Sequence, residues 1–288
     1  MTATLQPVAD ALAPEHLDPL IRAALDEDLG GGDVTSNALI PAAMTCRGKV
    51  VCRQNGVVCG VSVARRVFEL VDPSLRFDAK VADGDPVQAD HVLIRLHGSA
   101  RAVLGAERVA LNFLQHLSGI ATLTSHYARA VEGTKARILD TRKTTPGLRA
   151  LEKYATRIGG ALNHRMGLFD QVLIKDNHLA LVGGVSPALR AARKAYPDDD
   201  LIVEVACFQE LRTALDDNAP RILLDNFSPG QVREAMGLIR NRALVEVSGG
   251  VQASNARAYA LAGVDFISVG ALTHSAAALD MSLKVTLY

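Results

Sequence analysis

Residues 201–225 read LIVEVACFQELRTALDDNAPRILLD, and this stretch decides the fold. An apolar run at 201–205 is followed by a helical pattern at 210–216 and by a second apolar run at 222–224. Apolar strands without polar alternation are typical of parallel strands whose two faces are both covered by helices. The stretch therefore predicts a strand–helix–strand unit of an α/β fold.

The same alternation extends over the C-terminal half of the sequence. Further apolar runs and helical patterns are at residues 137–139, 172–174, 187–195, 230–239, 244–247, 253–261 and 266–269. Six predicted strands separated by helical segments are typical of a β/α barrel or of a doubly wound parallel sheet.

A charged residue or a glycine ends each predicted strand. These ends are Asp140 to Lys143, Lys175, Glu204, Asp225, Glu246 with Ser248-Gly249-Gly250 after it, and Gly270. In a barrel the C-terminal strand ends converge on one mouth, whereas a doubly wound sheet leaves most of them along a line. The pattern favours a barrel, and six strands, fewer than the eight of a closed barrel, predict an incomplete one.

The N-terminal part mixes helical and strand patterns without a regular alternation. We expect helices at 11–25, 61–71 and 99–131, and strands at 47–53, 75–81 and 92–97. This order predicts an α/β sandwich domain over residues 1–130 with linking helices. We expect the open barrel over residues 131–288, and a C-terminal tail that can return to the first domain.

Composition narrows the classes of partner. The chain has 31 Lys and Arg against 31 Asp and Glu, a net charge of zero. It therefore has no bulk attraction to nucleic acid or to an anionic membrane, and any anion site must be local. Residues 109–128 carry no charge, but Gln115 and His116 favour a buried helix over a membrane span. The N-terminus lacks the pattern of a signal peptide, so we expect a cytoplasmic protein.

The four cysteines lack the spacing of a metal site. We expect them to be small buried residues in a reducing compartment.

Three groups of residues indicate the chemistry. The cations Arg142, Lys143, His164, Arg165 and Lys175 suit carboxylates and phosphates. Any one of them alone is more simply explained as a solvated surface charge. That explanation does not account for the whole set at one end of a barrel.

The acids Glu204 and Asp225 suit Mg²⁺ or sugar hydroxyls, or balance the cations. The glycine turns at 248–250 and 270–271 suit a phosphate, or are simply tight turns. We see no nucleophile beside a base, no dinucleotide fingerprint and no metal cage.

The sequence resembles the quinolinate phosphoribosyltransferase family over almost its whole length. The resemblance is carried by ALDEDLGGGDVT at 24–35, ER at 107–108, LNFL at 111–114, SGIAT at 118–122, TRKTTPGLR at 141–149, NHR at 163–165, LIKDNH at 173–178, VEV at 203–205, LDNF at 224–227 and SGG at 248–250. The TRKTTPGLR and LIKDNH runs are long and specific, and the order and spacing of all the segments agree with the family.

The resemblance implies an N-terminal α/β sandwich and a seven-stranded open α/β barrel. It also implies a homodimer in which Arg108 reaches into the site of the partner. The implied reaction joins quinolinate to phosphoribosyl diphosphate with Mg²⁺, giving nicotinate mononucleotide, diphosphate and CO₂.

The residue roles that the resemblance implies follow the same motifs. Arg108, Arg142, His164 and Arg165 bind quinolinate; Lys143 and Lys175 contact a substrate or the diphosphate; Glu204 and Asp225 bind ribose or Mg²⁺; Ser248, Gly249, Gly250 and Gly270 hold the 5-phosphate.

The sequence departs from the family pattern at two positions. Ala161 stands where a third glycine is usual, and Ala206 where an acidic residue is common. If the backbone at residue 161 needed a positive φ, alanine would be strained there.

Two other functions remain open at this point. A related phosphoribosyltransferase could act on another acid, such as nicotinate, or be a molybdenum-associated homologue; several separate cations favour a dicarboxylate. A non-catalytic sugar-phosphate sensor could use the same scaffold, but Lys175, Glu204 and Asp225 together favour an enzyme.

Overall fold

Six parallel strands form the central sheet of the C-terminal half of this computed structural model, which describes residues 12–197 and 201–287. They are β6 (Arg137–Leu139), β7 (Leu173–Ile174), β8 (Ile202–Val205), β9 (Arg221–Asp225), β10 (Leu244–Ser248) and β11 (Phe266–Ser268). The predicted strands are confirmed, with ends that differ by at most one residue. All four residues of β8 are buried, as expected for a strand covered on both faces.

The strand order β6-β11-β10-β9-β8-β7 distinguishes a barrel from a doubly wound sheet. The first strand lies beside the last, and the others follow in chain order. A doubly wound sheet would instead reverse direction at an internal strand. An isolated parallel bridge between Leu139 and Leu162 adds a seventh position at the edge of β6. The sheet is therefore a barrel left open between this bridge and β7, as the sequence predicts.

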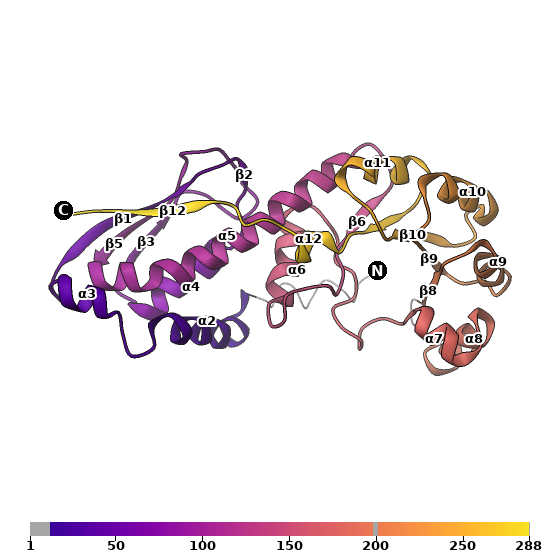
Figure 1. Cartoon of the computed structure of the whole chain (residues 1–288), viewed down its shortest axis with the longest axis horizontal. Coiled ribbons are helices and arrows are strands. Elements are labelled where there is room, and N and C mark those ends of the chain that lie inside the picture. The colour runs from indigo at the N-terminus through magenta and orange to yellow at the C-terminus, as the bar shows by residue number, and fades with distance from the viewer. Residues whose placement is uncertain (1–11, 198–200, 288) are drawn as a thin grey trace. The chain divides into compact units, whose positions relative to one another are not determined.

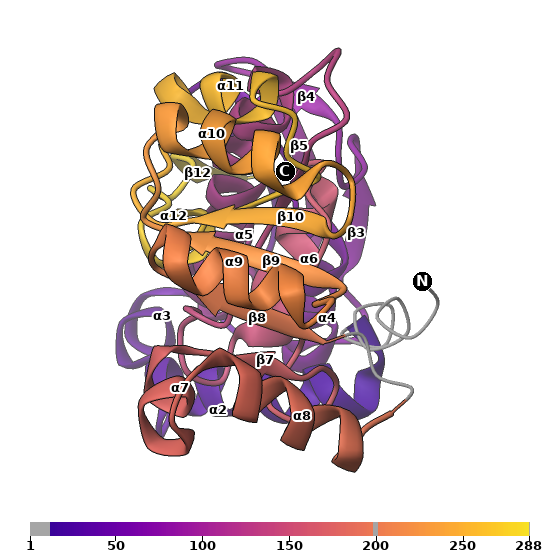
Figure 2. The same ribbon diagram turned by 90° about the vertical axis from the view of Figure 1, so that its right-hand side faces the viewer.

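Helices connect these strands on the outer side of the sheet (Figure 2). They are α7 (Asp176–Val182), α8 (Val185–Ala195), α9 (Phe208–Asp216), α10 (Pro229–Ile239) and α11 (Ala253–Leu261), and the short α12 (Ala271–His274) follows β11. The start of α10 shows why such a helix begins where it does. The Ser228 and Gln231 side chains satisfy each other's backbone N–H groups, and Pro229 occupies the first turn.

A second sheet has four antiparallel strands in the order β12-β1-β5-β3. They are β1 (Thr45–Cys52), β3 (Arg76–Ala79), β5 (Val92–Ser99) and β12 (Met281–Thr286); β2 (Gly56–Val57) and β4 (Pro86–Val87) form a separate pair. The C-terminal strand β12 lies at the edge of this sheet and pairs with β1, the first strand of the chain (Figure 1).

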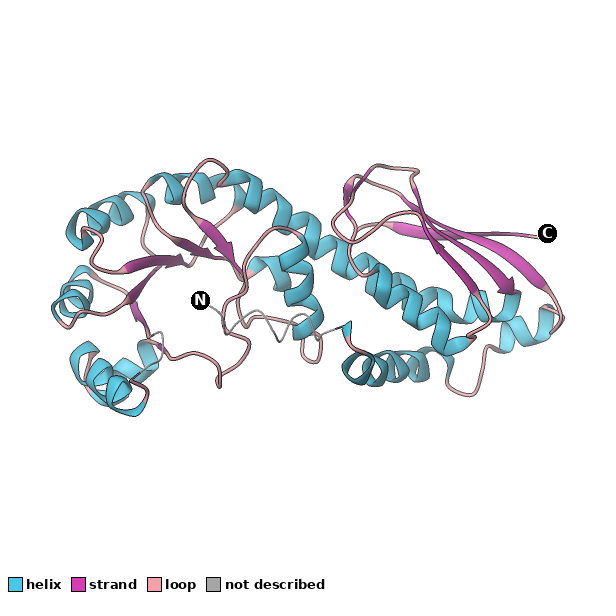
Figure 3. Ribbon diagram, turned by 180° about the vertical axis from the view of Figure 1, so that it is seen from behind, coloured by secondary structure: helices cyan, strands magenta, loops and turns pink. Residues whose placement is uncertain are grey.

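Helices cover one face of this sheet and leave the other face bare (Figure 3). They include α2 (Pro14–Leu29), α3 (Val34–Leu39), α4 (Val61–Val71) and α5 (Ala100–Ala130), and α6 (Arg149–Ile158) packs on the same core. The residues of β1 alternate between exposed and buried positions, with Val50 in the core and Lys49 outside. Such alternation is typical of a sheet with one solvated face.

The contacts within the chain define two compact units. The barrel unit contains residues 126–144 and 161–271, and the sheet unit contains residues 12–125, 145–160 and 272–287. The sheet unit is therefore assembled from three segments. Residue 11, at the start of the predicted first helix, lies outside the described residues.

The uncharged stretch 109–128 lies inside α5, and the prediction of a buried helix with polar contacts is confirmed. Ser118 Oγ accepts a hydrogen bond from the backbone nitrogen of Cys59 at 2.9 Å, and Gln115 Nε2 donates to the carbonyl oxygen of Met281 at 2.8 Å. None of the described helices is long and apolar enough to cross a membrane.

Three cysteines, Cys46, Cys52 and Cys59, are buried as expected. The expectation is wrong for Cys207, which is exposed because it lies at the N-cap of α9, past the buried end of β8.

Candidate active site

Polar side chains line the inner face of the parallel sheet near the C-terminal strand ends. The strand register places Glu204 beside Leu223 and Leu223 beside Glu246, so these three side chains share a face. Asp225 and Ser248 are two residues further on and lie on the same face, one layer closer to the strand ends. A buried sheet face is normally apolar, so this concentration of acids marks a site.

An ion pair joins the ends of two neighbouring strands. Lys175, which directly follows β7, places its Nζ 2.5 Å from Oε2 of Glu204 on β8. The Glu204 side chain is 9% exposed and that of Lys175 is 43% exposed. The lysine therefore neutralises a buried carboxylate while its own ammonium remains open to a ligand. The expectation that the acids balance the cations is confirmed for this pair.

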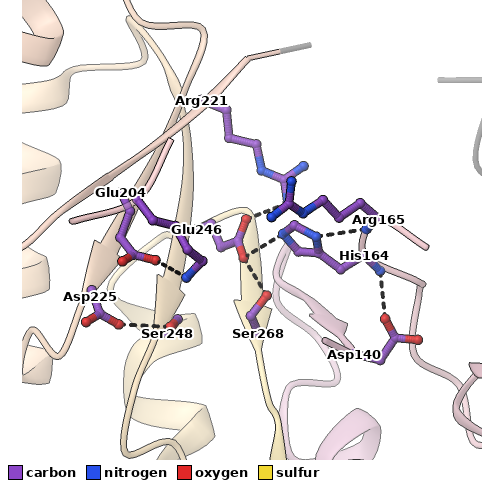
Figure 4. A network of polar contacts seen from close by, with 10 residues as sticks. Asp140, His164, Arg165, Glu204, Arg221, Asp225, Glu246, Ser248 and Ser268 are labelled. Carbon is purple, nitrogen blue, oxygen red and sulfur yellow. Dashed lines mark hydrogen bonds and ion pairs between the residues drawn. The ribbon is translucent and has the colours of Figure 1, made fainter. Parts of the chain in front are cut away.

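Asp225 belongs to a second polar group. Its Oδ1 accepts a hydrogen bond from Ser248 Oγ at 3.0 Å (Figure 4). Its Oδ2 accepts one from Asn226 Nδ2 at 2.7 Å. The backbone nitrogen of Asn226 donates to the carbonyl oxygen of Ser248 at 2.9 Å. These bonds fasten the turn after β9 to the turn after β10.

The turn after β10 requires glycine. Gly249 and Gly250 have φ angles of +88° and +63°, which side chains rarely adopt. A Cβ at position 249 would lie 2.1 Å from Oδ1 of Asn226, whereas one at position 250 would meet no atom within 4 Å. The backbone of Gly250 is thus open to a ligand, at the approach to helix α11.

The segment that carries His164 and Arg165 is anchored by Asp140, at the end of β6. Oδ1 of Asp140 accepts the backbone N–H of His164 at 2.8 Å, and its Oδ2 accepts Asn163 Nδ2 at 2.5 Å. Arg165 Nη1 donates to the carbonyl oxygen of Gln171 at 3.1 Å. Ala161, which precedes this segment, has no positive φ, so alanine is not strained there.

A buried acid lies beneath this segment. Glu246 has no exposed surface, and its carboxylate contacts His164 Nε2 at 3.3 Å, Arg221 Nη2 at 2.7 Å and the Ser268 hydroxyl (Figure 4). Burial alone would raise the pKa of Glu246. The hydrogen bond and electrostatic interaction with His164, the charge of Arg221 and the hydrogen bond from Ser268 outweigh burial and lower that pKa to about 2. Glu246 is therefore ionised at neutral pH.

Two arginines lie close enough to repel each other. Burial lowers the pKa of Arg165, and the charge of Arg142 lowers it further. Like charges held together in a buried place are relieved when an anion binds between them. Lys143, next to Arg142, is exposed.

The predicted site residues of the barrel unit all follow or end parallel strands, apart from His164 and Arg165. Contacts join Lys175 to Glu204, Asp225 to Ser248, and Arg142 electrostatically to Arg165. Gly270 precedes α12, and its φ is not positive. Arg108 is an exposed residue of α5 in the sheet unit.

Sequence reasoning missed four residues of this network as site residues: Asp140, Arg221, Glu246 and Ser268. Asp140 and Glu246 were recognised from the sequence as residues at strand ends, but they were given no role. Arg221 lies at the start of its strand, so the search for strand ends could not find it. Its guanidinium lies over the Phe266 ring, 4.1 Å from the ring centre.

Family models match both halves of the chain. The model of the quinolinate phosphoribosyl transferase N-terminal domain matches residues 33–118, and the model of the C-terminal domain matches residues 120–284. The chain belongs to the quinolinate phosphoribosyltransferase family.

Relatives in this family are similar in sequence to this chain over nearly its full length. The nicotinate-nucleotide pyrophosphorylase [carboxylating] of Mycobacterium leprae is 48% identical over 271 residues, which are 92% of this chain and 95% of the relative. The probable nicotinate-nucleotide pyrophosphorylase [carboxylating] of Bacillus subtilis is 41% identical, over 91% of this chain and 90% of its own.

A solved structure, NadC from Streptococcus pyogenes, superposes with a TM-score of 0.92 at 38% identity, over 96% of this chain and 98% of that one. The predicted family, fold class and enzyme class are confirmed: the chain is a pentosyltransferase that acts on quinolinate in NAD biosynthesis. Human nicotinic acid phosphoribosyltransferase, at 13% identity and a TM-score of 0.63, shares only the fold.

Proposed function

We propose that the mouth of the barrel unit binds quinolinate and phosphoribosyl diphosphate side by side and transfers the phosphoribosyl group to the ring nitrogen. The observation that carries this proposal is the gathering of cations, two carboxylates and a glycine turn at successive strand ends of one open barrel. Sites in this fold are built at that end of the barrel.

Quinolinate carries two carboxylates, and Arg142 and Arg165 supply guanidinium groups that suit them. Their mutual repulsion supports this role, because a dianion between them would remove it. His164 holds the backbone of Arg165 and contacts Glu246 with its other nitrogen. We assign to His164 the positioning of Arg165 for quinolinate binding, in place of direct contact with the carboxylate.

Phosphoribosyl diphosphate needs contacts at both ends. We assign Lys143 and Lys175 to the diphosphate, and the turn Ser248-Gly249-Gly250 together with Gly270 to the 5-phosphate. Glu204 and Asp225 are assigned to the ribose hydroxyls or a metal ion. In this proposal Lys175 exchanges its contact with Glu204 for one with the diphosphate, so that Glu204 can accept hydrogen bonds from the sugar.

Mg²⁺ fits the donors at the mouth. It prefers oxygen ligands, and it commonly binds one or two carboxylates together with substrate phosphates. Among the described residues, no group of three or more His, Cys, Asp and Glu side chains could hold a metal. Glu204 and Asp225 would therefore hold Mg²⁺ jointly with the diphosphate, where the ion would stabilise the leaving group.

The reaction balances without a redox cofactor. The C1–O bond of the ribose breaks and diphosphate leaves with the electron pair, while the pyridine nitrogen bonds to C1. The nitrogen becomes positive and stabilises the electron pair left on the ring when the adjacent carboxylate departs as CO₂. A proton then replaces that carboxylate, which gives nicotinate mononucleotide.

We further propose a homodimer in which Arg108 completes the partner's site, and a cytoplasmic location. The exposed position of Arg108 on α5 supports the first proposal. The family resemblance of the sequence motivates both.

The test is an assay of the purified chain with quinolinate, phosphoribosyl diphosphate and Mg²⁺, in which nicotinate mononucleotide and CO₂ are both measured. We expect equal amounts of the two products. Nicotinate in place of quinolinate is the discriminating substrate, because it lacks the second carboxylate. Turnover of nicotinate but not of quinolinate would contradict the proposal.

A further inference from the structure

The bare face of the antiparallel sheet concentrates positive charge. Five basic side chains are exposed on it, one or two from each strand: Arg47 and Lys49 from β1, Arg76 from β3, Arg95 from β5 and Lys284 from β12. We call these five residues the basic sheet face. The whole chain has a net charge of zero, so this concentration is local and does not follow from the composition.

The strand register places like charges directly opposite each other. Lys284 lies opposite Lys49, and Lys49 lies opposite Arg95. Opposite side chains on neighbouring strands have Cβ atoms about 5 Å apart, and like charges at that spacing destabilise a sheet. Three cations in one row across three strands therefore destabilise the sheet, and an anionic ligand would relieve their repulsion.

Carboxylates are scarce among the described residues of this face. Asp78 is the only carboxylate among the described residues that line this face, and its Oδ2 lies 2.6 Å from Nζ of Lys80. The hydrogen bond from Lys80 lowers the pKa of Asp78, as do the charges of Lys80, Arg76 and Arg95. Within residues 12–197 and 201–287, neither Lys49 nor Lys284 has a carboxylate within ion-pair distance.

The face is hollowed as well as charged. All five basic residues line one open depression of about 500 Å³, and Leu96 and Val92 also contribute to it. That volume is in the range of sites for small ligands. Of the described residues that line the depression, none is Phe, Tyr or Trp, and His97 supplies an imidazole ring. Five cations against one ring make charge the main feature that the depression can recognise.

We propose that the basic sheet face binds a small polyphosphate anion, in a site separate from the mouth of the barrel unit. Arginine forks and lysine ammonium groups are the side chains that recognise phosphate oxygens. The number of cations requires several negative charges close together, which a chain of phosphates supplies. The concave shape favours such a small anion over the broad surface of an acidic protein. No residue of this face belongs to the candidate active site.

The proposal is tested by calorimetric titration of the full chain with inorganic tripolyphosphate. Because the mouth also binds phosphates, the titration uses a background in which Arg142→Gln and Lys175→Gln disable the mouth. We expect one tripolyphosphate to bind per chain in this background. Adding Lys49→Gln and Arg95→Gln should weaken that binding by about tenfold or more, because two charge-assisted contacts are lost.

The matched control replaces Arg22 and Arg233, two exposed arginines outside the depression, with glutamine. It should leave the binding unchanged. ATP should bind about as tightly as tripolyphosphate, because the cations contact its phosphates. Much tighter binding of ATP would indicate that His97 or an arginine stacks on the base, and it would contradict recognition of the phosphates alone.

Folding of each variant is checked by its melting temperature. The effect of Lys49→Gln alone is measured in a chain with the mouth intact. Lys49→Gln should raise that temperature at low salt by relieving repulsion, and the gain should vanish at high salt.

Equal binding by the Lys49→Gln, Arg95→Gln variant would overturn the proposal. So would binding of duplex DNA without binding of tripolyphosphate, which would indicate a nucleic-acid surface. A change in oligomeric state in that variant, with no binding by the parent, would indicate a contact between copies of the chain.

Discussion

His164 Nδ1 accepts a hydrogen bond from the backbone nitrogen of Arg165 at a distance of 2.8 Å. A ring nitrogen that accepts a hydrogen bond carries no proton, so this contact assigns the ring proton of His164 to Nε2. Nε2 faces Oε1 of Glu246 at 3.3 Å and donates to it. Both nitrogens are thus engaged within the protein, which is why we assign His164 a positioning role.

The first prediction follows from these two contacts. His164→Phe should raise the KM for quinolinate, measured at saturating phosphoribosyl diphosphate, and leave the KM for phosphoribosyl diphosphate nearly unchanged. In a background that already carries Arg165→Ala, His164→Phe should raise the KM for quinolinate little further, because His164 acts through Arg165. Fully additive effects of the two substitutions would favour direct binding of quinolinate by His164.

The second prediction concerns Glu246. Its pKa in the folded chain is about 2, below the usual 4.5, so its contribution to stability is complete above pH 4.5 and is lost as the pH falls toward 2. Glu246→Gln leaves Arg221 buried without its counter-charge and should cost about 3–5 kcal/mol at neutral pH. Urea unfolding between pH 2 and 7 measures both effects.

Glu234→Gln, at an exposed position of α10, is the control for this experiment. It should change the free energy of unfolding by less than about 0.5 kcal/mol. A Glu246→Gln variant that is as stable as the parent at neutral pH, with the same acid transition, would contradict the ionised state of Glu246.

The third prediction separates two demands on the glycine turn. Gly249 and Gly250 both have positive φ, but only Gly249 is crowded, by Asn226. Gly250→Ala should cost about 1–2 kcal/mol from backbone strain alone. Gly249→Ala should cost more, and it should raise the KM for phosphoribosyl diphosphate because the turn must shift. Equal losses in the two variants would mean that contact with Asn226 is unimportant.

The fourth prediction tests the shared site of the proposed homodimer. Arg108→Ala and Lys175→Ala chains should each be nearly inactive. In a mixed dimer, one site combines an intact barrel with an intact Arg108. Random mixing should therefore restore about a quarter of the parent activity, given a twofold-symmetric dimer. In the control, both chains of the dimer carry Lys175→Ala, so no site is intact and no activity should return. Absence of rescue in a verified mixed dimer of Arg108→Ala and Lys175→Ala chains excludes the shared site.

The fifth prediction concerns the metal. Removal of Mg²⁺ by a chelator should abolish activity, and added Mg²⁺ should restore it. Asp225→Asn should raise the Mg²⁺ concentration needed for half-maximal activity, because a carboxylate is replaced by a weaker neutral ligand. Glu234→Gln should leave that concentration unchanged. An unaltered Mg²⁺ dependence in Asp225→Asn would assign Asp225 to the ribose alone.

The strand ends were predictable because a buried parallel strand has an unambiguous sequence signal. The run at 201–205 is entirely apolar except for Glu204, and a lone acid there has few structural explanations. The convergence of these ends on one mouth followed from fold geometry alone. The family resemblance then supplied the substrates, which no residue pattern could have named.

The buried network and α6 were harder to predict, for physical reasons. Arg221 and Glu246 lie 25 positions apart in sequence, and only the strand register brings them together. Helix α6 buries Glu152 and Lys153, so its inward face does not look apolar in the sequence. Glu152 is satisfied by the backbone nitrogen of Thr145 at 3.1 Å and by His116 at 2.9 Å, and neither partner could be inferred from spacing.

Strand β12 has a consequence for biosynthesis. It completes a sheet whose other strands lie before residue 100, yet it is synthesised after every strand of the barrel. During translation, one edge of β1 therefore remains unpaired until β12 is made. An exposed strand edge of this kind can pair with strands of other chains. Nascent chains that stall within the barrel should aggregate through β1, and a peptide with the sequence of residues 281–286 should protect them.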